Sequence, residues 1–223
     1  MNSLINTFFT KEYEDSVNKS LLERDFSLSQ QELVAYIDDV ISIPITDYLE
    51  WIDNHTFLGI DSSDMLQISS FEAVFYGVVD CMLIDGDKGY KFIDIGKLLL
   101  NDGIPRKKGA YTKYGENNAK TAEYMGYLFS VKQRYFVSCL GYALKWIDKE
   151  KQDKLYTRLL MRTNLFKAIY LMTKNGEISL RELFDFLSDK TYLRRRGGTK
   201  KILYSMMNSE EFDFTQIFSK VLF

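Results

Sequence analysis

The chain has few of the residues that build catalytic and metal centres. Among its 223 residues it has one histidine, His55, and two cysteines, Cys81 and Cys139. A histidine-rich metal centre is therefore excluded, and a histidine-activated nucleophile would have to use His55, whose setting in DNHTFLG is typical of a helix end or surface. The cysteines lie in apolar stretches without metal or redox spacing. We expect them to be buried free thiols, which suits a reducing cytoplasm.

Recognisable catalytic motifs are also missing. The common restriction nucleases need an Asp followed by Asp/Glu-x-Lys, and no lysine of this chain has an acidic residue two positions before it. The chain has no GxxxxGK[ST], GxGxxG or paired CxxC motif either. We therefore expect no cofactor, no metal and no catalysis by this chain alone. One enzyme alternative stays open, a metal-dependent nuclease with an atypical site around Asp80, Asp85, Asp87 and Asp94.

Membrane and secretory signals are not visible. No apolar run approaches the about 20 residues that a membrane span needs, and the opening MNSLINTFFTKEYEDS has neither a basic start nor a long apolar segment. Hydrophobic residues make up 46% of the chain and aromatic residues 15%, which predicts a folded protein with a substantial core. We expect a cytoplasmic protein that does not associate with membranes.

Charge is distributed unevenly along the sequence. Residues 1–103 hold six Lys and Arg against nineteen Asp and Glu, whereas residues 104–223 hold twenty-three against twelve. Such an asymmetry indicates a polyanionic partner for the basic part. The alternative is that the acidic and basic parts neutralise each other in the folded chain.

The acidic part predicts helices. Apolar residues recur at helical spacing in 27–43, with Ser27 or Ser29 as the cap, and in 44–60, with Thr46 as a possible cap and an end near Gly59. Residues 68–85 are strongly apolar and fit either a helix or a strand. Trp51, Phe57, Phe71, Phe75 and Tyr76 supply core or interface material.

The basic part predicts helices followed by ribbons. Residues 92–103 and 116–126 predict helices, 127–141 a two-stranded ribbon, 142–176 helical segments, 177–208 a helix pair, and 211–223 a strand or wing. Helices followed by a ribbon describe a winged helix, and this order occurs about twice. We expect a mainly α protein with small β wings: an acidic helical region over 1–87, a winged helix over 88–150 and a second one over 151–223.

Several motifs between 88 and 215 support this expectation through a family resemblance. They are Tyr114-Gly115-Glu116-Asn117, Ala119-Lys120, Gly126, Leu140-Gly141, the run 155–166 centred on Leu159-Leu160 and Arg162, and Thr191, Arg194, Arg195 and Thr199. The pattern resembles a winged-helix module of bacterial restriction-modification and related defence proteins. Gly197-Gly198 departs from it, because each glycine inside a helix costs about 1 kcal/mol relative to alanine. That helix is expected to end early, or its backbone to approach a group such as a phosphate.

Two basic stretches carry the predicted DNA contacts. In the first, cations track phosphates, the amides of Asn117 and Asn118 pair with adenine, and a wing tip holds further cations; Asn117 could alternatively be an N-cap. In the second, RRRGGTKK, a cap at Thr191 would place the arginines in the first turn of a recognition helix, and the alternative is a solvated basic face. The predicted DNA-binding residues are Arg106, Lys107, Lys108, Lys113, Asn117, Asn118, Lys120, Lys132, Arg134, Arg194, Arg195, Arg196, Thr199, Lys200 and Lys201.

These observations predict sequence-specific or structure-guided binding of double-stranded DNA by tandem winged helices. The resemblance implies a non-catalytic component of a restriction-modification or related defence system, with a nuclease or methyltransferase subunit as a partner. The main alternative is an adaptor whose winged helices bind other proteins and whose acidic part contacts basic partners. For that acidic part three roles are open: partner docking, an intramolecular mimic of DNA, and formation of a homodimer.

Overall fold

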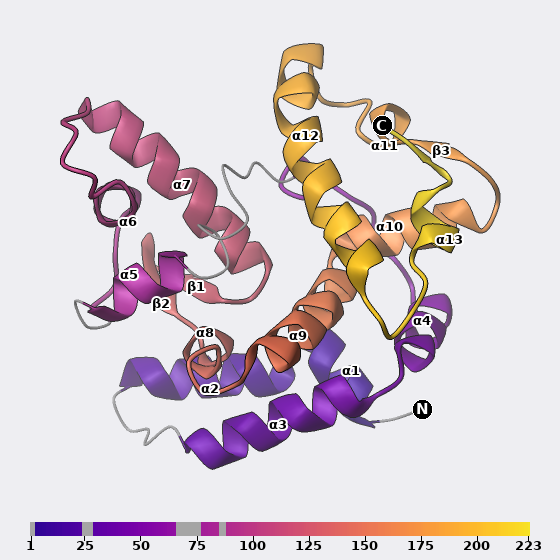
Figure 1. Cartoon of the computed structure of the whole chain (residues 1–223), viewed down its shortest axis with the longest axis horizontal. Coiled ribbons are helices and arrows are strands. Elements are labelled where there is room, and N and C mark those ends of the chain that lie inside the picture. The colour runs from indigo at the N-terminus through magenta and orange to yellow at the C-terminus, as the bar shows by residue number, and fades with distance from the viewer. Residues whose placement is uncertain (1–2, 24–28, 66–76, 85–87) are drawn as a thin grey trace. The chain divides into compact units, whose positions relative to one another are not determined.

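The computed structural model is mainly helical with two small sheets, which confirms the expected fold class (Figure 1). It describes residues 3–23, 29–65, 77–84 and 88–223. The helices are α1 (Ser3–Thr10), α2 (Glu12–Glu23), α3 (Gln30–Ser42), α4 (Ile45–Asp53), α5 (Val78–Ile84), α6 (Phe92–Leu99), α7 (Lys108–Tyr124), α8 (Cys139–Ala143), α9 (Lys149–Arg162), α10 (Asn164–Thr173), α11 (Leu180–Leu183), α12 (Asp189–Ser205) and α13 (Thr215–Phe218). The strands are β1 (Leu128–Val131), β2 (Arg134–Val137), β3 (Ile178–Ser179) and β4 (Val221–Leu222).

The chain divides into two compact units. The first unit comprises Met1–Thr10, Ile37–Gln67 and Lys149–Phe223, and the second comprises Lys11–Tyr36 and Ile68–Asp148. This division differs from the regions 1–87, 88–150 and 151–223 set out above, because the acidic region supplies segments to both units. The change of unit after Asp148 lies close to the expected boundary at 150.

In the second unit, α6 and α7 pack closely through two glycines. A Cβ atom on Gly115 would lie 1.8 Å from the carbonyl oxygen of Phe92, and one on Gly96 would lie 1.9 Å from that of Tyr111. Only glycine allows the two backbones to come this close. The helix expected over 116–126 is longer than expected, because it begins eight residues earlier, at Lys108. The basic stretch that was expected as a loop forms its first turns.

The expected ribbon over 127–141 is confirmed. β1 and β2 pair antiparallel, with Leu128 opposite Val137 and Val131 opposite Arg134. Lys132 and Gln133 connect them with φ angles of 48° and 63°, as a tight two-residue hairpin requires. Tyr90, between α5 and α6, adds an antiparallel bridge to Tyr135 of β2, with N–O distances of 2.9 and 2.8 Å.

The first unit ends in a different arrangement. The tail expected as a strand or wing forms α13 and the two-residue strand β4, which pairs in parallel with β3. Phe214 and Phe218 pack edge-on against Phe166 of α10, with ring centroids 6.1 and 6.3 Å apart. Residues 149–223, all described, therefore hold a parallel strand pair in place of a hairpin wing.

Of the helix caps predicted in the acidic region, one is confirmed and one is wrong. Ser29 caps α3 as expected, since its Oγ accepts from the backbone N–H of Glu32 at 3.3 Å. Thr46 is not a cap: it lies inside α4, which follows Pro44 and ends at Asp53, well before Gly59.

The expected core residues and thiols are partly observed. Trp51 is buried and Phe57 half-buried, while Phe71, Phe75 and Tyr76 lie outside the described residues. Both cysteines are free thiols; Cys139 is buried and Cys81 partly so. None of the described helices is both long and apolar enough to cross a bilayer.

Candidate nucleic-acid interface

The outer face of α7 carries three of the predicted contacts. Lys113, Asn117 and Lys120 recur at helical spacing on the side opposite the buried Asn118 and Ala122. Both lysines pair with Glu116, each with an Nζ–Oε distance of 2.9 Å. Hydrogen bonds from Lys120 and then Lys113 lower the pKa of the Glu116 carboxyl. This face is therefore basic with one carboxylate between two lysines.

The two asparagines of α7 have different surroundings. Asn118 is fully buried and donates from Nδ2 to the carbonyl oxygen of Tyr114 at 2.8 Å, so its predicted contact with a base is wrong. Asn117 is half-buried in the middle of the helix, which excludes the N-cap alternative because the cap is Lys107. Its amide remains a predicted base contact.

The start of α7 presents cations to solvent. Lys107 and Lys108 are exposed, and no side chain caps the helix. Free backbone N–H groups and the positive end of the helix dipole attract anions at such a terminus. Arg106 is already engaged, because its two guanidinium nitrogens each donate to an Asp102 carboxylate oxygen at 2.6 Å. This ion pair holds the pKa of Asp102 below its usual range.

The ribbon places one cation at its tip and one at its base. Lys132 is exposed in the hairpin turn, as expected. Arg134 begins β2 and donates from Nη1 to the carbonyl oxygen of Gly89 at 2.8 Å. Lys132 is therefore the ribbon cation best placed for a phosphate, whereas Arg134 also supports the fold.

The helix α12 runs without a break through Gly197-Gly198, so the first of the two alternatives, an early end, is wrong. Its N-cap is Ser188, whose Oγ accepts from the backbone N–H of Thr191 at 3.4 Å. Thr191 is thus the third helical residue and not the cap. The three arginines at 194–196 consequently lie beyond the first turn, where the predicted cap would have placed them.

One side of α12 belongs to the scaffold. Thr199 is fully buried together with Tyr192 and Leu203, so its predicted DNA contact is wrong. Arg195 donates from Nη1 to the carbonyl oxygens of Ser62, at 2.6 Å, and Met65, at 3.2 Å. These bonds fasten the loop after α4 to α12.

The other side of α12 is basic and exposed. It holds Arg194, Arg196, Lys200 and Lys201. The Lys200 ammonium lies 5.0 Å from the ring centroid of Tyr204 and 4.9 Å from that of Phe223. The alternative of a solvated basic face remains open for these four cations.

The predicted residues thus fall into two groups. Those on the α7 stretch and the ribbon, from Arg106 to Arg134, belong to the second unit, and those on α12 belong to the first. Within these groups Asn118 and Thr199 are buried, and Arg195 bonds to the loop after α4.

The charge asymmetry of the sequence disappears within the units. The first unit contains fifteen Lys and Arg against sixteen Asp and Glu, and the second contains fourteen against fifteen. Ion pairs join the acidic and basic parts: Lys151 with Asp38 at 2.7 Å in the first unit, and Lys145 with Asp80 in the second. Each unit therefore carries a net charge of only −1, and any attraction for DNA is local.

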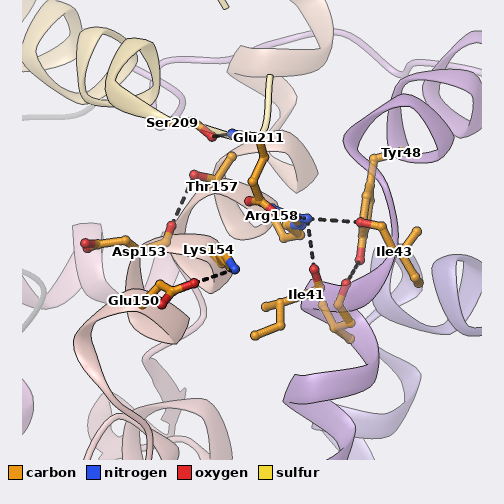
Figure 2. A network of polar contacts seen from close by, with 11 residues as sticks. Ile41, Ile43, Tyr48, Glu150, Asp153, Lys154, Thr157, Arg158, Ser209 and Glu211 are labelled. Atoms are coloured by element: carbon orange, nitrogen blue, oxygen red, sulfur yellow. Dashed lines mark hydrogen bonds and ion pairs between the residues drawn. The ribbon is translucent and has the colours of Figure 1, made fainter. Parts of the chain in front are cut away.

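Sequence reasoning missed that two arginines of α9 are buried. Figure 2 shows the surroundings of one of them, Arg158. Arg158 is 1% exposed; it pairs with Glu211 and donates from Nη2 to the carbonyl oxygens of Ile41 and Ile43, both at 3.0 Å. Arg162 donates to the carbonyl oxygen of Phe8 at 3.1 Å. Both lie on the apolar stripe of α9, and this spacing was the available signal.

The described residues offer no support for a metal site. Asp80 pairs with Lys145, and Asp94 accepts the backbone N–H of Lys91 at 3.2 Å; Asp85 and Asp87 lie outside the described residues. Within the described part of the chain, no three His, Cys, Asp or Glu side chains gather around a common point. His55 stacks on Trp51 just after α4, with ring centroids 3.8 Å apart.

Comparisons with known proteins add no relatives. No protein-family model matches the chain, and neither the curated proteins nor the solved structures include a significant match.

Proposed function

We propose that the protein binds double-stranded DNA through α7 and the β1–β2 ribbon. Support comes from the order of elements in the second unit: α5, the Tyr90 bridge, α6, α7 and then the ribbon. This is the order of a winged helix, in which the helix before the ribbon is the recognition helix. The observation that carries the proposal is that five of the nine exposed lysines in the described residues 77–84 and 88–148 lie at the start of this helix, on the helix or at the hairpin tip.

Phosphate contacts would come from five lysines. Lys107 and Lys108 lie at the open start of α7, Lys113 and Lys120 on its outer face, and Lys132 at the hairpin tip. The bonds of two of them to Glu116 do not prevent this, because an exposed ion pair contributes little and exchanges readily for a phosphate. Asn117, between them on the same face, would contact base edges.

The basic side of α12 would provide a second phosphate contact, making the protein a tandem DNA binder. We further propose a cytoplasmic, non-catalytic role in a restriction-modification or related defence system, where a nuclease or methyltransferase subunit supplies the chemistry. This part of the proposal rests on the resemblance between residues 88 and 215.

The test is a salt titration of binding to a labelled 30-base-pair duplex, measured by fluorescence anisotropy. The five phosphate contacts of α7 and the ribbon predict a slope of log K against log salt of about −4.5, and contacts from α12 would make it steeper. Replacing Lys113 and Lys120 by glutamine should make this slope shallower by about 2, whereas Lys19→Gln on α2 should leave it unchanged. A flat salt response, or equal effects of both changes, would contradict the proposal.

One observation favours an adaptor function as the second candidate. Fewer cations are available for a polyanion than the sequence implied. Each unit is nearly neutral, and Arg158, Arg162 and Arg195 bond to backbone carbonyls within the fold. An adaptor would show no DNA binding at low salt, and would retain a protein partner through nuclease treatment. The same salt titration therefore separates the two candidates.

A further inference from the structure

The second unit contains a pocket that neither α7 nor the hairpin tip uses. Its volume is about 480 Å³, and it lies between α6, the start of β2 and the segment before α6. Lys88, Lys97 and Arg134 line it together with a single carboxylate, Asp94. The pocket thus combines three cations with one anion.

One face of helix α6 lines the pocket. Asp94, Lys97 and Leu98 recur at helical spacing, and Asn101 follows just after the helix ends. Asp94 is held at the helix start, because its carboxylate accepts the backbone N–H of Lys91 at 3.2 Å. This wall therefore offers an ammonium, an amide and an apolar side chain from a rigid element.

Another part of the lining depends on a glycine. Gly89 has a φ of +74°, and a Cβ there would lie 2.5 Å from the ring of Phe136. Its carbonyl oxygen accepts from Nη1 of Arg134 at 2.8 Å. That bond uses one of the five N–H donors of the guanidinium, so the group is positioned while other donors remain for a ligand.

Among the described residues, the lysines of the pocket have no ion-pair partner. Neither Lys88 nor Lys97 forms an ion pair with any residue in the described ranges. By contrast, Lys113 and Lys120 on α7 and Lys149 and Lys154 on α9 each pair with a carboxylate. Lys88 instead lies over the ring of Tyr90, 5.6 Å from its centroid. The described residues that line the pocket therefore carry a net positive charge within a unit that is nearly neutral.

We propose that this pocket binds a small phosphorylated molecule. Arg134 and Lys97 would hold the phosphate groups, since a guanidinium matches phosphate oxygens with two parallel bonds. Leu98 and the edge of Tyr90 would contact a less polar part of the ligand. The volume lies within the range of about 300–1,000 Å³ typical of small-molecule sites. This inference does not rest on DNA binding.

The experiment is isothermal titration calorimetry of the whole chain with ADP and with pyrophosphate, without DNA. Both should bind. Lys97→Gln removes one charge-assisted contact and should weaken binding about tenfold. Asp94→Asn keeps an acceptor for Lys91 but removes the opposing charge, and should strengthen binding about threefold. Lys19→Gln, the same charge change outside the pocket, should have no effect.

Two outcomes would overturn the proposal. One is that neither ADP nor pyrophosphate binds at millimolar concentration while the melting temperature shows a folded protein. The other is that Lys97→Gln and Lys19→Gln change the affinity equally, which would indicate diffuse attraction. Loss of duplex binding in Lys97→Gln without any ADP binding would assign the pocket to a DNA phosphate instead, and would leave the proposed function intact.

Discussion

Replacing Arg158 with alanine should destabilise the first unit by about 3 kcal/mol. Its guanidinium is 1% exposed and bonds to both carboxylate oxygens of Glu211 and to the carbonyl oxygens of Ile41 and Ile43 (Figure 2). Truncation leaves all of these acceptors without their donor. It also removes the cation that lies 5.7 Å from the centroid of the Tyr48 ring.

The magnitude follows from how far the remaining groups can be hydrated. Removing one partner of a buried ion pair costs about 3–5 kcal/mol. The Glu211 side chain is 26% exposed, so water can solvate it in part, and the lower end of that range applies. Glu211→Gln should cost less than Arg158→Ala, because the amide oxygen still accepts a hydrogen bond and no buried cation loses all its acceptors.

Tryptophan fluorescence during urea unfolding measures this loss in the correct unit. The chain has two tryptophans; Trp51 belongs to the first unit and Trp146 to the second, so a Trp146→Phe background isolates the signal of Trp51. Lys154→Ala is the matched control on the same helix, because its ion pair with Glu150 is exposed. A loss for Arg158→Ala no larger than for this control would refute the reasoning.

Three further predictions concern the second unit. Gly115→Ala should cost at least about 2 kcal/mol in thermal unfolding, because its Cβ would lie 1.8 Å from a carbonyl oxygen of α6, whereas Gly109→Ala on the same helix has open space and should be neutral or stabilising. Replacing Lys132-Gln133 by Asn-Gly should stabilise the hairpin by about 0.5–1 kcal/mol in urea unfolding, since both residues have positive φ. Because the pKa of Glu116 is lowered, its contribution is present above the ordinary carboxyl pKa of about 4.3 and is lost as pH falls through the folded value. Wild type and Glu116→Gln should therefore differ in melting temperature at pH 7, and the difference should shrink as the pH falls below the ordinary carboxyl pKa.

Local signals in the sequence predicted the elements that depend on local structure. The stripe and Ser29 cap of α3, the short helix α6 and the polar centre of the ribbon all have such signals. The start of α7 does not, because Gly109 and a run of lysines read as a loop. Gly96 and Gly115 let α6 and α7 pack closely, and such tertiary packing is not contained in local helix propensity.

The residues of the candidate site could be predicted only where the sequence shows which face of a helix is buried and which is exposed. Thr199 falls in one stripe with Tyr192, Arg195 and Ile202, and reading this stripe would have assigned it to the core. The sequence identified Lys113 and Lys120 correctly as exposed. It could not show the bonds of Arg195 to Ser62, because they join segments more than a hundred residues apart.

The near-neutral units also limit how DNA would be attracted. At physiological salt, exposed charges act over about 8 Å, so a lysine influences an approaching phosphate only at close range. In a unit with a net charge of −1 no long-range field favours the encounter. Binding by α7 should therefore begin near the slow end of association rates, about 10⁵–10⁶ M⁻¹s⁻¹, and its rate should depend weakly on salt while the dissociation rate carries most of the salt dependence. An association rate that falls steeply between 50 and 200 mM salt would instead require the two basic surfaces to act on the duplex together.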